Sequence, residues 1–109
     1  MAFDTELADR IRKSLGKEAG VTERQQFGGV AFLVNGNVAC GVITNDMLVR
    51  VGPEKHEQSI ANKHAKAFSL TGRPSKGWVI ISRNGLKTAA ELNKWVRLGR
   101  DFAAGLPPK

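Results

Sequence analysis

The sequence has a single cysteine, Cys40, and lacks any long hydrophobic run. A lone cysteine excludes an intrachain disulfide bond, which is typical of proteins from a reducing compartment. The longest run of apolar residues and glycine, from Gly28 to Val34, is far too short to span a membrane. The first ten residues contain acidic side chains and no apolar segment of the kind that a secretory signal needs. We therefore expect a cytoplasmic protein with no membrane partner.

Acidic residues are scarce in the second half of the chain. Residues 1–52 hold six basic and six acidic side chains, whereas residues 53–109 hold eleven basic and four acidic ones, so the net charge of +7 falls on the second half. Such an excess is typical of proteins that bind an anionic partner, although solvated lysines on an ordinary domain give the same composition. With 109 residues, 41% of them hydrophobic, the chain fits one globular domain over residues 1–109.

The first half predicts one helix followed by strands. Asp4 is a suitable N-cap, and apolar residues recur at helical intervals as far as Leu15. Two apolar runs then flank Asn35-Gly36, which predicts a β-hairpin because a type I′ turn needs positive φ at both of its central residues. The strands are expected over residues 30–34, 38–43 and 47–51. The weakly alternating residues 21–27 are a further strand or a loop.

The second half predicts two helices and two short strands. Pro53 suits the first position of a helix, which we expect to end near Asn62. Thr88 and Glu91 form a capping box for the last helix, whose apolar residues fall on one face and whose basic residues fall on the other. The strands are expected over residues 67–70 and 78–81.

This order, α-β-β-β-α-β-β-α, predicts an α+β fold of two layers with a mainly antiparallel sheet. In such a fold one face of the sheet is normally exposed to solvent, so every second residue of a strand should be polar. In residues 30–34 and 38–43, however, the residues expected on either face are apolar. Something should therefore cover the second face. Either a homodimer or a long terminal helix of the same chain would do so.

Residues 24–37 combine several features that are weak taken singly. The features are Phe27, Gly28 and Gly29, an apolar strand, and the turn at Asn35 and Gly36. Together with residues 48–51 and the later strand at Gly77-Trp78, they resemble the TfoX N-terminal domain family over essentially the whole chain. The resemblance implies a two-layer, secretion-chaperone-like architecture.

The resemblance also implies a regulatory context, since the family takes its name from a regulator of bacterial competence for DNA uptake. It implies no catalytic residues. In that regulator a separate helical domain follows, and because this chain ends at Lys109 we expect a stand-alone N-terminal module.

Several groups of residues are candidates for binding. The paired glycines at Gly28-Gly29 permit close approach of a ligand to the backbone, but a bend or bulge in a strand is the favoured explanation. The loop over residues 71–77 is basic, yet it lacks the ending of a phosphate-binding P-loop. Trp78 is expected in the core, with stacking on a nucleic-acid base as the alternative. The candidate contacts with a partner are Arg73, Lys76, Lys87, Lys94 and Arg97.

The residues give little support to an enzyme. His56 and His64 are eight residues apart, whereas two metal ligands on a helix need a spacing near four. Cys40 lies among apolar residues, where a thiol stays protonated. Arg50 interrupts an apolar strand and either pairs with a buried carboxylate or points outward at a sheet edge. We expect no catalytic residue, no metal and no cofactor.

The leading hypothesis is a non-enzymatic regulatory or interaction module that binds a macromolecular partner, either protein or nucleic acid. The alternative is direct, low-specificity binding of nucleic acid through the basic second half, which would weaken steeply with salt. No helix-turn-helix or RNP aromatic pattern supports that alternative. A small-molecule enzyme of unknown reaction is the third hypothesis.

Overall fold

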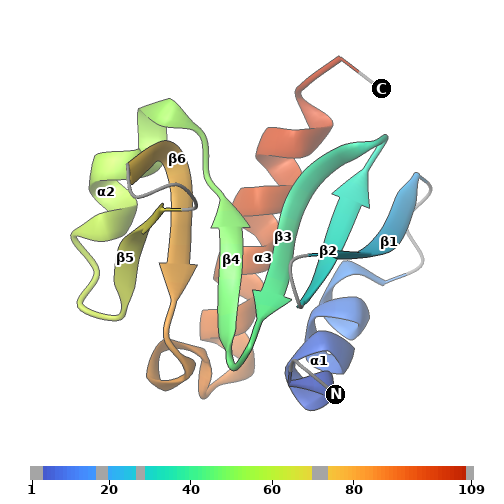
Figure 1. Ribbon diagram of the computed structural model, residues 1–109, viewed down its shortest axis with the longest axis horizontal. Coiled ribbons are helices and arrows are strands. Elements are labelled where there is room, and N and C mark those ends of the chain that lie inside the picture. Colours follow the sequence, from blue (N-terminus) through green and yellow to red (C-terminus); the bar gives the residue numbers. More distant parts are fainter. Residues whose placement is uncertain (1–3, 17–19, 27–28, 70–73, 108–109) are drawn as a thin grey trace.

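The computed structural model describes residues 4–16, 20–26, 29–69 and 74–107, which form helices and strands in the predicted order (Figure 1). Residues 21–26 form the further strand that the sequence left open. The elements are α1 (Thr5–Leu15), β1 (Val21–Gln26), β2 (Gly29–Val34), β3 (Asn37–Ile43), β4 (Asp46–Arg50), the 3-10 helix η1 (Pro53–Lys55), α2 (His56–Ile60), β5 (Ala65–Ser69), β6 (Pro74–Ile81), the 3-10 helix η2 (Arg83–Leu86) and α3 (Ala89–Ala104).

The described strands form one six-stranded antiparallel sheet in the order β1-β2-β3-β4-β6-β5. The predicted hairpin is confirmed: Val34 pairs with Asn37, and the turn residues Asn35 and Gly36 have φ angles of 53° and 85°. Positive φ at both positions is the requirement of the type I′ turn. After β4 the chain forms α2 before it returns, so β6 lies beside β4 and β5 becomes the edge strand.

Three predicted segments differ in extent from the structure. Instead of one helix to Asn62, a short 3-10 turn leads into α2, which ends at Ile60. The side chain of Asn62 accepts a hydrogen bond of 2.9 Å from the backbone N–H of His64, which forms a turn directly before β5. Strand β5 therefore begins at Ala65 rather than at residue 67. Strand β6 begins at Pro74 because it pairs with β5 from that residue onward.

The helices pack on one face of the sheet and form the core with it (Figure 1). The buried helical side chains come from both ends of the chain, with Ile11 from α1 and Leu92 and Trp95 from α3 among them. They meet alternate residues of the strands, such as Val42 and Val49, which are completely buried. The α+β, two-layer prediction is confirmed, and none of the described helices is long and apolar enough to cross a membrane.

The other face, which we call the open face, is opposite the helices. Residues directly opposite each other on neighbouring strands share a face. One such row crosses the whole sheet and consists of Arg24, Ala31, Gly41, Leu48, Ile80 and Lys66. Ala31 and Leu33 on this face are buried, whereas Leu48 and Ile80 are only half-buried. The long terminal helix does not provide the cover predicted from the sequence, because α3 packs on the opposite face.

Helix α3 approaches the sheet very closely at Gly99. A methyl group added to Gly99 would overlap the backbone carbonyl oxygen of Ala39 in β3. Ala39 lies at the irregularity of β3, where the register with β2 shifts between Phe32 and Leu33. Only glycine therefore allows the helix backbone to rest against the strand backbone at this point.

Replacing Gly99 tests this contact. We expect Gly99→Ala to lower the free energy of unfolding by about 1–3 kcal/mol, because overpacking against rigid backbone outweighs the higher helix propensity of alanine. The measurement is chemical denaturation followed by circular dichroism. Gly105→Ala is the matched control, since a methyl group there would lie 3.5 Å from its nearest neighbours, and we expect it to be neutral or to stabilise by up to about 1 kcal/mol. Equal stability of the two variants would contradict the steric role of Gly99.

Candidate functional site

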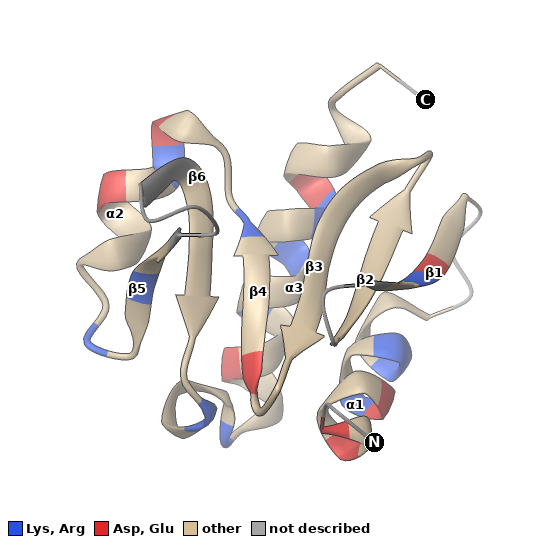
Figure 2. Cartoon of the chain, viewed as in Figure 1, with Lys and Arg blue, Asp and Glu red and all other residues tan. Residues whose placement is uncertain are grey.

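The lysines and arginines of the described residues are spread over several helices and strands (Figure 2). Lys94 and Arg97 lie one turn apart on the exposed side of α3. Lys87 is exposed as well, but it precedes α3. Lys76 belongs to β6, and its side chain lies outside what the structure describes, as does the whole of Arg73. Among the three candidates whose side chains are described, the structure brings Lys94 and Arg97 together.

Lys94 and Arg97 line a shallow groove between α3 and the α2 region. The groove has a volume of about 590 Å³, and its lining residues are Lys55, Gln58, Ala90, Asn93, Lys94, Arg97, Leu98 and Asp101. The carboxylate of Asp101 is engaged by Arg100 at 3.0 Å. Lys94 lies 5.4 Å from the ring of Trp95. Within the described part of the chain, Lys55, Lys94 and Arg97 form no ion pair, so three cations face one groove.

Lys55 completes this basic groove, and the sequence analysis did not include it. It precedes Lys94 by almost forty residues and belongs to η1, which packs near α3 only in the folded chain. In the sequence Lys55 follows the acidic residue Glu54, so the local charge pattern does not indicate a basic site. A local signal for Lys55 was therefore absent, because the grouping depends on how α2 is placed against α3.

Of the glycine pair at 28–29, the structure describes Gly29, and its surroundings explain why glycine is needed there. Gly29 pairs with Ile43, and a methyl group on it would overlap the carbonyl oxygen of Val42. Gly41 is similar, since its methyl group would lie 2.5 Å from the carbonyl oxygen of Val30. Strands β2 and β3 thus approach each other closely. Phe27 and Gly28 lie outside the described residues.

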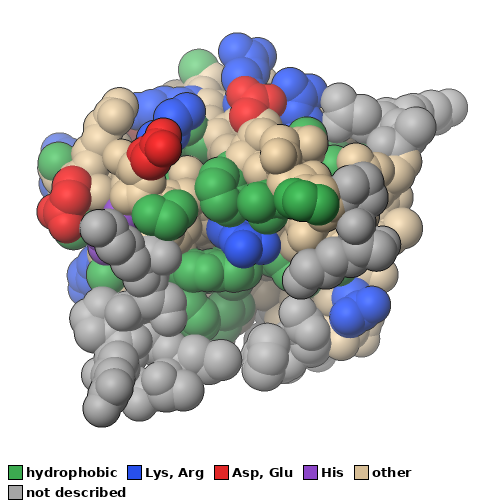
Figure 3. Space-filling model, turned by 90° about the horizontal axis from the view of Figure 1, so that it is seen from above, with side chains coloured by type: hydrophobic (Ala, Val, Ile, Leu, Met, Phe, Trp, Pro, Cys, Tyr) green, Lys and Arg blue, Asp and Glu red, His purple; other side chains and the backbone are tan. Residues whose placement is uncertain are grey.

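Arg50 lies on the open face of a central strand, so neither of the alternatives predicted for it holds. Strand β4 runs between β3 and β6, and no carboxylate pairs with Arg50 among the described residues. Its guanidinium carbon lies 5.0 Å from the centre of the Trp78 ring and 5.2 Å from that of Phe102. Trp78 is half-buried on the open face and not in the main core. Seen from above, hydrophobic and basic side chains lie next to each other at this end of the sheet (Figure 3).

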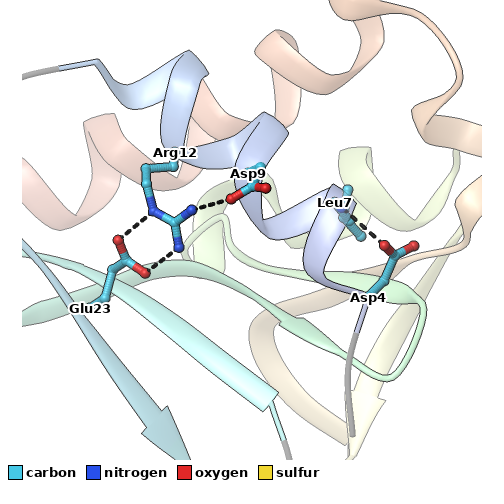
Figure 4. A network of polar contacts seen from close by, with 5 residues as sticks. All are labelled: Asp4, Leu7, Asp9, Arg12 and Glu23. Atoms are coloured by element: carbon cyan, nitrogen blue, oxygen red, sulfur yellow. Dashed lines mark hydrogen bonds and ion pairs between the residues drawn. The ribbon is translucent and has the colours of Figure 1, made fainter. Parts of the chain in front are cut away.

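A second groove, of about 340 Å³, lies between α1 and the β1–β2 hairpin. Three of its charged residues, Asp9, Arg12 and Glu23, are engaged with one another, whereas Arg24 forms no ion pair among the described residues. Arg12 donates two hydrogen bonds of 2.7 Å to the carboxylate of Glu23 and a further one to Asp9 (Figure 4). These bonds lower the pKa of Glu23 and raise that of Arg12. The pairing joins α1 to the edge strand β1 and leaves little charge for a ligand.

The histidines and the cysteine have structural surroundings. His56 is buried, and its Nδ1 accepts the backbone N–H of Gly77 at 2.9 Å, which connects α2 to β6. No group of three residues in the described ranges could hold a metal ion. Cys40 is completely buried, and burial raises the pKa of its thiol to about 12. The expected protonated state of this thiol is thus supported by its surroundings.

The Arg12–Glu23 pair predicts a pH dependence. Because the pKa of Glu23 is lowered below its ordinary value of 4.5, its contribution to stability is present above that value and is lost as the pH falls through the lowered pKa. Both side chains are more than a third exposed, at 49% and 37%. We therefore expect Glu23→Gln to cost at most about 1 kcal/mol at pH 7.

Urea denaturation at a series of pH values measures this effect. The difference between wild type and Glu23→Gln should shrink below pH ~4.5 and vanish at lower pH. Glu54→Gln removes an exposed carboxylate that has no ion pair among the described residues and should be near neutral throughout. A cost for Glu23→Gln that stays constant into acid would show that the ion pair is not its source.

Burial of Cys40 predicts slow reaction with thiol reagents. At pH 8 the native protein should react with an aromatic disulfide reagent at least about a hundredfold more slowly than the urea-unfolded chain, because the thiol is both inaccessible and protonated. The measurement is absorbance of the released thiolate over time. Equal rates in the native and unfolded states would contradict the burial of this residue.

Comparison with known proteins places the chain. No curated protein and no solved structure matches it. The family model of the TfoX N-terminal domain matches residues 13–103. This range runs from within α1 to the last turn of α3 and includes the whole sheet, the basic groove and Arg50. The match covers far more than half of the sequence, so the chain belongs to the TfoX N-terminal domain family.

Proposed function

We propose that this chain is a non-enzymatic, competence-related regulatory module that acts by binding an anionic macromolecular partner through its basic groove. Membership of the TfoX N-terminal domain family supports the regulatory context. The observation that carries the binding surface is the convergence of Lys55, Lys94 and Arg97 on one groove.

Three cations in one groove repel one another unless anions lie between them. Among the described lining residues the one carboxylate belongs to Asp101, which pairs with Arg100. A partner that supplies carboxylates or phosphates would relieve this repulsion and form charge-assisted hydrogen bonds. The positive field of the whole chain, with its net charge of +7, would also speed the encounter with such a partner.

The other lining residues favour an acidic protein surface over nucleic acid. They are aliphatic or carry amides, as with Leu98 and Asn93, and no aromatic residue among them offers a platform for base stacking. Nucleic-acid binding remains the second candidate, because the same cations could contact phosphates. Two residues that an enzyme could use are engaged in the fold instead. Cys40 is buried and the pKa of its thiol is raised, and Nδ1 of His56 accepts a hydrogen bond from the backbone N–H of Gly77.

Fluorescence anisotropy can test the proposal. The probes are labelled poly-L-glutamate and short duplex and single-stranded DNA, each titrated at about 50 and about 200 mM salt. In Lys55→Gln/Lys94→Gln/Arg97→Gln, the affinity for poly-L-glutamate should fall about tenfold or more, since exposed ion pairs contribute up to about 1 kcal/mol each. If duplex DNA binds through the groove, this variant should reduce the slope of log K against log salt by about 2.7.

The matched control is Lys13→Gln/Lys63→Gln/Lys66→Gln. These lysines are exposed outside the groove, and their replacement lowers the net charge by the same three units. The control should lose much less affinity than the groove variant. Equal losses would indicate a non-specific effect of net charge, and no binding of any probe at low salt would contradict the proposal. Binding of DNA but not of poly-L-glutamate would favour the second candidate.

A further inference from the structure

Arg50 lies near the end of β4, where its guanidinium is close to the ring of Trp78 from the neighbouring strand β6 and to the ring of Phe102 from α3. Trp78 is its direct neighbour across β4 and β6, and Phe102 reaches it from the last turns of α3. Both rings lie close enough to the guanidinium carbon, at 5.0 and 5.2 Å, for cation–π contacts. We call Arg50, Trp78 and Phe102 the Arg50 cluster.

Two glycines with positive φ build the backbone corner under this cluster. Gly52 has a φ of 89°, and a methyl group on it would lie 2.5 Å from the Phe102 ring. The carbonyl of Gly77 accepts the N–H groups of Val51 at 2.8 Å and of Gly52 at 3.1 Å. The N–H of Gly77 in turn donates to Nδ1 of His56. The corner is thus fixed from both sides, so the position of the guanidinium is preorganised.

The aromatic rings do not satisfy the hydrogen bonds of the guanidinium. An arginine has five N–H donors, and ring faces attract its charge without accepting these donors at full strength. In the described ranges, no carboxylate or carbonyl accepts a hydrogen bond from Arg50. Arg50 is half-buried and thus partly exposed to solvent. The best complement for such a group is a carboxylate, which can accept two parallel hydrogen bonds.

The surface around the cluster is aliphatic. Leu48 and Ile80 lie opposite each other on β4 and β6, two residues from Arg50 and Trp78, and both are half-buried on the open face. Such a surface matches apolar side chains of a polypeptide better than a nucleic acid. The ring of Trp78 already contacts the guanidinium of Arg50, so this ring face is not free to stack on a base.

We propose that the open face binds a segment of another protein that places an aspartate or glutamate on Arg50 and apolar side chains on Leu48 and Ile80. Charge complementarity argues for this occupant over a second copy. Arg24 and Lys66 lie on the same face, whereas Asp46 is its one carboxylate among the described residues. Two copies face to face would bring these like charges together, and each carries +7. This surface is on the other side of the sheet from the basic groove.

Selection of peptides tests the proposal. A phage library of random twelve-residue peptides would be selected on the immobilised full-length chain and, in parallel, on Arg50→Gln. The wild type should enrich peptides in which Asp or Glu is flanked by apolar residues, and the variant should lose the acidic position. Lys55→Gln/Lys94→Gln/Arg97→Gln should enrich the same peptides as the wild type, which separates this surface from the groove.

The best peptide then gives a measurement that does not depend on how a variant folds. Replacing its acidic residue by the corresponding amide should weaken binding to the wild-type chain at least about tenfold in isothermal titration calorimetry. The same replacement should have little effect on binding to Arg50→Gln, whose fold is checked by circular dichroism.

Four outcomes would overturn the proposal. They are no enrichment of peptides, enriched peptides without an acidic residue, equal selection by wild type and Arg50→Gln, and a dimer in light scattering that Leu48→Glu dissociates. The last would assign the open face to a second copy, as the sequence had left open.

Discussion

The contact between Gly99 of α3 and the backbone of Ala39 in β3 sets the geometry of this domain. Because no side chain separates the two backbones there, the helix lies against the sheet at a fixed depth and position. Trp95, one turn before Gly99, and Ala103, one turn after it, are both buried in the core. A helix held further away would leave cavities beneath these residues, and cavities in a core are costly.

The position of α3 also determines what the two sides of the molecule present. On the helical side, its exposed residues Lys94 and Arg97 meet Lys55 across the groove. Toward the end of the same helix, Phe102 packs on Gly52 and contacts the guanidinium of Arg50. One helix therefore contributes to both proposed binding surfaces. Because these proposed surfaces are on opposite sides of the sheet, a partner on one would leave the other accessible.

Most of the polar residues that first attract attention serve the fold instead. Arg12 and Glu23 connect α1 to the edge strand β1, and their charges are matched (Figure 4). His56 connects α2 to β6 through the backbone of Gly77. The cations of the two proposed surfaces differ, because no anion pairs with them among the described residues. They are Lys55, Lys94 and Arg97 in the groove and Arg50 beside its rings. Unmatched cations are where an external anion gains most.

The sequence by itself determined the local structure, because the signals for it are local. Asn35-Gly36 requires positive φ and predicted the hairpin, while the apolar spacing in α3 predicted its buried face. The double apolar phase of β2 correctly indicated burial on both faces. The family resemblance rested on the same continuous segment and is confirmed by the match over residues 13–103.

Only the tertiary structure decided which distant residues meet. Lys55 joins Lys94 and Arg97, and Arg50 meets Phe102, across separations of about forty and about fifty residues that no periodicity records. Likewise, the sequence showed that Arg50 interrupts an apolar strand, but not that β4 is central and its neighbour aromatic. The reason is physical: backbone dihedrals and hydrophobic spacing act over a few residues, whereas a binding surface depends on how whole elements pack.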